Sequence, residues 1–434
     1  MSEWRQPPVA DPCEFLVARR MPLRPPRPLQ WGRRLVDLLG PTGDAARQSL
    51  VALFFNSSTS FIAGAFLGAM VGTFERLPGL LVMVPAAIGL RGNIFTTFGN
   101  RISTAVHTGT FTPSLKRETV LGQNVLASMS LTLVMSLILA VVARIVSLAF
   151  GVTDAISVLD LALVGILGGV LASLIVLAAS ILLSVVAVRR NWDLDNLVAP
   201  SVSTLGDVVT IPCLFLASLL VGKGQWTVWL SWLIIIVSVA AFVMSLRTRL
   251  ADLRRIVLES LPVLTAAVVL STLAGLAVEK RLNLFTALPA LLVLEPAFVS
   301  SAGALGGILS GRVSTNLHLG FVEPTLVPGR EARRDAVLVL ALGLPVFVFN
   351  ALGAQFVATL IGQASPGIVQ MLSASLIAGL LTVLFVVALA YYGTIAAWRV
   401  DLDPDTIGIP VVTASVDFVG VVVLIAVVVA LGIV

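Results

Sequence analysis

Long apolar stretches separated by short polar segments make up almost the whole chain after residue 48. A helix needs about 20 predominantly apolar residues to cross the hydrocarbon core of a bilayer. This criterion predicts eleven spans, at residues 50–74, 78–106, 120–149, 156–188, 197–222, 226–246, 258–278, 286–317, 335–361, 367–397 and 407–433. Several of these exceed a single crossing, which predicts tilted or broken helices. The expected fold class is an all-α integral membrane protein with eleven transmembrane helices.

Composition agrees with this expectation and excludes other classes of protein. Of the 434 residues, 58% are hydrophobic and only 12% are charged, which is more apolar surface than a soluble core of this size could bury. The net charge of +5 does not indicate a nucleic-acid partner, because the basic residues lie between apolar runs and in the N-terminal tail. Cys13 lies in the polar tail and Cys213 in an apolar run, so neither a disulfide framework nor a cysteine metal site is expected.

The lysines and arginines predict how the chain is oriented. With a cytoplasmic N-terminus, 23 of the 28 fall on the inner side, in residues 1–48, 91–117, 189–190, 247–255, 312–334 and Arg399. Four fall outside, and one, Arg144, lies within a span. Because basic residues favour the cytoplasmic side, we expect a multi-pass protein of the cell (plasma) membrane with the C-terminus outside. The tail 1–48, with eight arginines, is expected to lie on the inner membrane surface.

Two phrases recur along the chain. "NRISTAVHTG" (100–109) and "GRVSTNLHLG" (311–320) hold its only two histidines, and a shift of 211 aligns residues 85–109 with 296–320 without a gap. At a shift of 210, "DLDNLVAPSVSTLGD" (193–207) matches "DPDTIGIPVVTASVD" (403–417). The chain is therefore predicted to be a duplicated unit.

The repeat also predicts the organisation of the spans. Each unit has five spans, and an odd number would invert the second copy unless one more helix returned the chain. The sixth span has no counterpart and supplies that helix. We predict a cytoplasmic tail, a first five-helix repeat, a linking transmembrane helix and a second, parallel repeat, at residues 1–48, 49–222, 223–250 and 251–434. The copies would be related by a pseudo-twofold axis along the membrane normal, and a single chain is expected to function as a monomer.

Two aspartates at membrane depth are the main functional candidates. Asp207 lies about ten residues, or roughly 15 Å, past the start of its span, and Asp417 occupies the equivalent position in the last span. A carboxylate at mid-membrane is costly unless it faces water, a partner or a cation. Helical spacing places each on a polar stripe, formed by Asn196, Pro200, Ser203, Asp207 and Thr210 in one span and by Thr406, Pro410, Thr413 and Asp417 in the other.

The second span carries a further polar stripe, consisting of Asn93, Thr97, Asn100 and Thr104. Gly89 and Gly92 interrupt the helix where backbone carbonyls could face a pathway. In the eighth span Ala304 replaces Asn93, and Glu295 stands where the first copy has Val84. Glu295 could cap a half-helix begun by Pro296 or supply a ligand, and both interpretations stay open.

These residues resemble a known family. "PAAIGLRGNIFTTFGNRISTAVHTG" and the two repeated phrases are similar to the membrane domain of MgtE magnesium channels, and especially to solute carrier family 41, in which two such domains are fused. The resemblance covers nearly everything from residue 50 to the end. It implies a transporter, and no enzyme, with a magnesium pathway between two bundles. It also implies that Asp207 and Asp417 hold the ion and that Asn93 is the family's second-span asparagine.

The chemistry of magnesium fits these residues. Mg²⁺ requires near-octahedral oxygen coordination and releases its waters reluctantly, so a few carboxylates gripping a hydrated ion suit it, whereas soft ligands are missing. The predicted site for the transported divalent cation, most simply Mg²⁺, comprises Asp207, Asp417, Asn93, Ser203, Thr413 and Glu295.

Competing interpretations concern both function and individual residues. Paired membrane aspartates could form the dyad of an intramembrane aspartyl enzyme, or a proton-coupled transporter of another solute could use them. N-capping would explain the aspartates that precede the two stripes, which are Asp193, Asp195, Asp403 and Asp405. The histidines are expected to tether the inner loop rather than bind metal.

Overall fold

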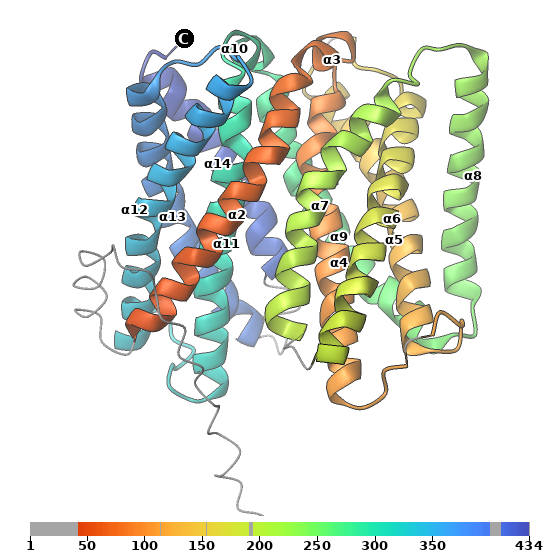
Figure 1. Cartoon of the computed structure of the whole chain (residues 1–434), viewed down its shortest axis with the longest axis horizontal. Coiled ribbons are helices and arrows are strands. Elements are labelled where there is room, and N and C mark those ends of the chain that lie inside the picture. Colours follow the sequence, from red (N-terminus) through yellow and green to blue (C-terminus); the bar gives the residue numbers. More distant parts are fainter. Residues whose placement is uncertain (1–41, 113, 153, 191–193, 400–408, 434) are drawn as a thin grey trace, which may run out of the picture. The chain divides into compact units, whose positions relative to one another are not determined.

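The computed structural model describes residues 42–112, 114–152, 154–190, 194–399 and 409–433. Within these ranges the chain is helical with connecting turns and contains no strand. Almost all of the tail 1–48 lies outside them. The helices (Figure 1) are α2 (Thr42–Ala69), α3 (Val71–Arg76), α4 (Leu80–His107), α5 (Val120–Ala149), α6 (Val158–Arg190), α7 (Leu194–Ser218), α8 (Gln225–Arg247), α9 (Ala251–Glu279), α10 (Leu282–Ala287), α11 (Ala290–His318), α12 (Arg330–Leu360), α13 (Ile368–Arg399) and α14 (Ile409–Ala430).

The chain is a multi-span membrane protein. Ten helices in the described ranges are long and apolar enough to cross a bilayer, namely α2, α4, α5, α6, α8, α9, α11, α12, α13 and α14. The remaining long helix, α7, has a described apolar stretch of only Thr204–Ser218, which is shorter than a full crossing requires. The all-helical membrane class is confirmed, and the eleventh span stays a prediction.

Two predicted spans are broken near one end, as their excess length suggested. The span at 50–74 becomes α2 and α3, and the span at 286–317 becomes α10 and α11. Before α4 the chain turns at Gly79, whose φ of 86° is accessible mainly to glycine. The short helices α3 and α10 contact each other. We call this side of the helix array the α3–α10 end (Figure 1).

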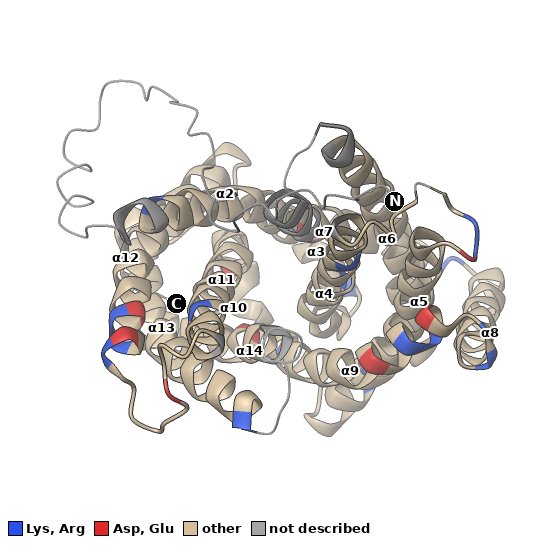
Figure 2. Ribbon diagram, turned by 90° about the horizontal axis from the view of Figure 1, so that it is seen from below, with Lys and Arg blue, Asp and Glu red and all other residues tan. Residues whose placement is uncertain are grey.

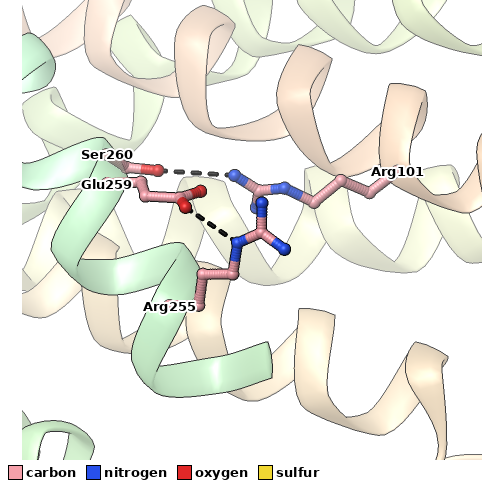
Figure 3. Close-up of polar contacts among 4 residues, drawn as sticks. All are labelled: Arg101, Arg255, Glu259 and Ser260. Carbon is pink, nitrogen blue, oxygen red and sulfur yellow. Dashed lines mark hydrogen bonds and ion pairs between the residues drawn. The ribbon is translucent and has the colours of Figure 1, made fainter. Parts of the chain in front are cut away.

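The opposite side, called here the basic end, is where α4 and α11 finish and where α5, α9 and α12 begin. Seen from below, its lysines and arginines lie at helix termini and connecting loops (Figure 2). Arg312 Nε forms an ion pair with Asp335 Oδ1 at 2.7 Å. Arg101 Nη2 lies 3.4 Å from Ser260 Oγ of α9, beside the exposed Arg255–Glu259 pair (Figure 3). Arg101 and Arg312 therefore attach the ends of α4 and α11 to different neighbouring helices.

The prediction that Arg91 lies on the inner side, with the other basic residues of 91–117, is wrong. Arg91 lies in the middle of α4, at 1% exposure. Its guanidinium donates to the Ala87 carbonyl at 2.9 Å and to Ser136 Oγ of α5 at 3.0 Å, and Gly169 of α6 leaves the space that it occupies. The oxygen acceptors and the space left by Gly169 accommodate this cation inside the helix array. Its position is therefore explained by packing and does not indicate the orientation of the chain in the membrane.

The first helix of each predicted repeat packs against the other repeat. In α2, Gly64 lies directly against the backbone of Val293 in α11, and in α9, Gly275 lies directly against the backbone of Val82 in α4. Gly64 and Gly275 are 211 residues apart, as are Val82 and Val293, so the two contacts are equivalent in the two repeats. A glycine without a Cβ lets two helix backbones approach closely. The two units of the sequence therefore interlock through α2 and α9.

Candidate functional site

The interlocked helices enclose a cavity of about 530 Å³. Its wall comes mainly from α2, α4, α9 and α11, with contributions from α7 and α14. On α4 the lining residues run from Leu81 to Asn100, which corresponds to about 28 Å along a helix axis. The cavity therefore extends through most of the thickness of a hydrocarbon core.

Both mid-span aspartates lie on the wall of this cavity. Asp207 comes from α7 and Asp417 from α14. Ser271 of α9 donates a hydrogen bond from Oγ to Asp417 Oδ2 at 2.9 Å. Within the described ranges the two ion pairs, Arg255–Glu259 and Arg312–Asp335, involve neither aspartate. The cavity is thus lined by carboxylates that no described basic side chain pairs with, a setting that favours a cation.

Glu295 is the third carboxylate on the wall, and it is 7% exposed. The helix that carries it begins at Ala290, and Pro296 lies inside that helix. Glu295 is therefore the sixth residue of α11, so the interpretation of it as a cap on a half-helix begun by Pro296 is wrong. A proline can be tolerated within a transmembrane helix, which the sequence pattern alone could not distinguish from a helix start.

The other predicted site residues divide into two groups. Asn93 and Thr413 line the cavity, and the methyl group of Thr413 faces Gly303 of α11. The side chains of Ser203, His107 and His318 lie outside the described part of the chain, as do Asp193, Asp403 and Asp405. The cavity therefore brings together five of the six predicted residues, which are Asp207, Asp417, Asn93, Thr413 and Glu295.

The structure adds serines that the sequence analysis missed. Ser271 and Ser60 both line the cavity, and they are equivalent at the repeat spacing of 211 residues. Asn56 and Ser300 also line it, and Asn56 Nδ2 donates to Ser300 Oγ at 2.8 Å. A polar residue recurring at the repeat spacing in two otherwise apolar spans is the signal that would have identified the serine pair.

In the described ranges, no three His, Cys, Asp or Glu side chains come close enough to form a metal-ligand cluster. The wall instead offers separated carboxylates together with hydroxyl and amide groups. Thr97 donates its hydroxyl to the Asn93 carbonyl at 2.6 Å, leaving the hydroxyl lone pairs as acceptors. Such a wall can accept hydrogen bonds from the water shell of an ion.

If this cavity carries the magnesium that the family resemblance implies, Ser271→Ala is predicted to weaken transport. The change removes the described hydroxyl donor to Asp417, so the carboxylate loses its fixed orientation; loss of one hydrogen bond to a charged group costs about 1.5–3 kcal/mol. We expect magnesium flux into liposomes to fall roughly tenfold. The neighbouring Thr272→Ala is the matched control, because Thr272 donates only to its own helix, at the Val268 carbonyl. Equal effects of the two changes would contradict an orienting role for Ser271.

Comparison with known proteins identifies the family. A family model described as MgtE, divalent cation transporter, matches residues 84–217 and again residues 295–427. These two matches cover more than half of the chain. The chain belongs to the MgtE family. The double match also confirms that the membrane domain is duplicated.

Individual members of solute carrier family 41 align with most of the chain. Member 3 from Mus musculus is 23% identical over 424 residues, which cover 89% of this chain and 84% of that protein. Member 2 from Homo sapiens is 24% identical over 411 residues, covering 87% of this chain and 69% of that protein. This MgtE-family chain is therefore a member of a group of transporters rather than of enzymes, and the resemblance read from its repeated phrases is confirmed.

Proposed function

We propose that this MgtE-family protein transports divalent cations, most simply Mg²⁺, through the cavity between its two interlocked repeats. The observation that carries the proposal is the placement of Asp207 and Asp417, equivalent residues of the two repeats, on the wall of one cavity. Their two negative charges match the two positive charges of the ion. Mg²⁺ dehydrates reluctantly, so it would pass with most of its water shell.

The remaining predicted site residues have defined parts in this proposal. Asn93, Ser203 and Thr413 would hydrogen-bond to waters of the ion's shell. Glu295, which replaces Val84 of the first repeat, would add a third negative charge on one side of the pathway. The site would therefore be only pseudo-symmetric, with α4 supplying an amide and α11 a carboxylate.

The organisation inferred from the sequence belongs to the same proposal. The two five-helix repeats at 49–222 and 251–434 would lie parallel, joined by a linking helix within 223–250. The basic end would face the cytoplasm under the positive-inside rule, in the cell membrane. Because helices of both repeats line one cavity, a single chain would contain a complete pathway and function as a monomer.

Flux measurements with the pure protein test the proposal. The protein is reconstituted into liposomes so dilutely that most vesicles hold at most one chain, with a magnesium-sensitive dye inside. We expect magnesium entry that depends on the protein and scales with the fraction of occupied vesicles. Absence of divalent-cation flux from folded protein would contradict the proposed function. Flux that appears only at high protein density would contradict the monomer. Proton-coupled uptake of an organic solute without magnesium flux would favour the competing transporter class.

A further inference from the structure

The two ends of the cavity differ in chemistry. Towards the basic end its α4 wall is polar, with Asn93, Thr96, Thr97 and Asn100. Along this wall exposure increases, from 2% at Leu81 to the exposed Asn100. Towards the α3–α10 end the wall becomes apolar. The cavity lining is therefore polar and more exposed towards the basic end, and apolar and buried at the other end.

Four apolar side chains line the cavity at this buried end, and we call them the apolar closure: Leu67 of α2, Leu81 of α4, Val278 of α9 and Leu292 of α11. Each lines the cavity and is at most 2% exposed. They form two pairs at the repeat spacing of 211 residues, Leu67 with Val278 and Leu81 with Leu292. Each repeat thus contributes one side chain from its first helix and one from its second.

A second apolar layer follows the closure. Phe74 of α3 is fully buried and Phe285 of α10 is 2% exposed, and these residues are also equivalent at a spacing of 211. The helices that carry them contact each other. The path from the cavity to the α3–α10 end therefore runs into two successive layers of buried hydrocarbon.

A buried carboxylate fastens the closure. Glu279, at 8% exposure, follows Val278 in α9. Its Oε1 accepts a hydrogen bond at 2.8 Å from the backbone N–H of Gly79, which is the N-cap of α4 two residues before Leu81. The positive end of the α4 dipole favours a carboxylate here. This contact ties the end of α9 to the start of α4, and these helices carry two of the four closure residues.

We propose that the apolar closure is a gate, which shuts the cavity at the α3–α10 end in this conformation, with Glu279 as the clamp that holds it shut. The inference rests on the proposed function, in which the cavity is the transport pathway. Buried hydrocarbon excludes a hydrated divalent ion, because the ion cannot replace its water there. Transport then requires α4 and α9 to separate at this end, breaking the Glu279 contact, while the carboxylates stay accessible from the basic end.

Thiol labelling tests the gate without measuring any ion flux. The background carries Cys13→Ser and Cys213→Ser, which removes both native cysteines, and Thr96→Cys reports on the polar part of the cavity wall. A membrane-impermeant charged thiol reagent is applied to either face of the vesicles, without magnesium. Two exposed loop markers identify the faces, Lys223→Cys for the α3–α10 end and Lys116→Cys for the basic end.

We expect Thr96→Cys to react from the basic end and to react slowly from the α3–α10 end. Adding Leu81→Ser and Leu292→Ser should raise the rate from the α3–α10 end roughly tenfold, a barrier reduction of about 1.4 kcal/mol. The matched control is Leu90→Ser, a buried cavity-lining leucine below the closure whose equivalent is Ser301. It should leave the rate from that end unchanged.

Glu279 provides a second test that leaves the cavity lining intact and stands on its own if the leucine variants fail to fold. Glu279→Ala removes the acceptor and should also raise labelling from the α3–α10 end. Glu279→Gln keeps an acceptor for Gly79 N–H and should not. The gate would be overturned if Thr96→Cys were labelled equally fast from both faces while the closure is unaltered. It would also be overturned if the labelling rate from the α3–α10 end did not increase in folded Leu81→Ser/Leu292→Ser or in folded Glu279→Ala. If the proposed function were wrong, only the flux assay would show it, whereas a wrong gate proposal would show in the labelling rates. The two failures are therefore distinguishable.

Discussion

Asp207→Asn and Asp417→Asn are each expected to reduce magnesium flux by an order of magnitude or more. Asparagine preserves size and hydrogen-bonding capacity but removes the charge. At a separation of about 5 Å and an effective dielectric constant of about 20, a carboxylate attracts a divalent ion by about 7 kcal/mol. Loss of even a fifth of this attraction corresponds to a tenfold change in affinity for the ion. The measurement is entry of magnesium into dye-loaded liposomes.

The double variant adds a test of whether both aspartates serve one ion. If they do, the first substitution already disables the site, and the second should add little. The control is Asp252→Asn, an exposed aspartate in the first turn of α9, which should transport normally. Fully multiplicative effects would indicate two separate sites. Normal flux in the double variant would show that these aspartates are not part of the ion pathway.

Gly89→Leu is expected to block the pathway without changing its charge. Gly89 lines the cavity in α4, and a Cβ added to it would lie 3.8 Å from Asp417 Oδ2 and 3.9 Å from Ser271 Oγ. These are ordinary contact distances, so Gly89→Ala fits. The longer leucine side chain would extend beside the Asp417 carboxylate, where the ion is proposed to bind.

The expected outcome is flux near the wild-type value for Gly89→Ala and a reduction of roughly tenfold or more for Gly89→Leu. Alanine and leucine both favour helix more than glycine does, so α4 should remain intact in either variant. Thermal unfolding in detergent checks this. A folded Gly89→Leu protein with undiminished flux would mean that ions do not pass along this wall.

The amino-acid sequence by itself determined the membrane class, the duplication and the central carboxylates. So many apolar runs of about 20 residues or more, in a chain with 12% charged residues, carry more apolar surface than a soluble core could bury, which leaves the bilayer as their environment. The repeated phrases can be recognised without knowing how the helices pack, and the family model matches both copies. Asp207 and Asp417 stood out because a carboxylate among apolar residues has a large cost that local capping cannot explain.

Only the tertiary structure decided which helices face each other. Sequence spacing reports order along the chain, whereas the close approaches of Gly64 to Val293 and of Gly275 to Val82 depend on long-range packing. Because α9 packs against both α4 and α14, Ser271 reaches Asp417, and the apolar closure takes one side chain from each of four helices. Likewise, the sequence could not show that Arg91 is buried within α4 rather than on the inner side, because its oxygen partners on α5 and α6 become neighbours only after the helices assemble.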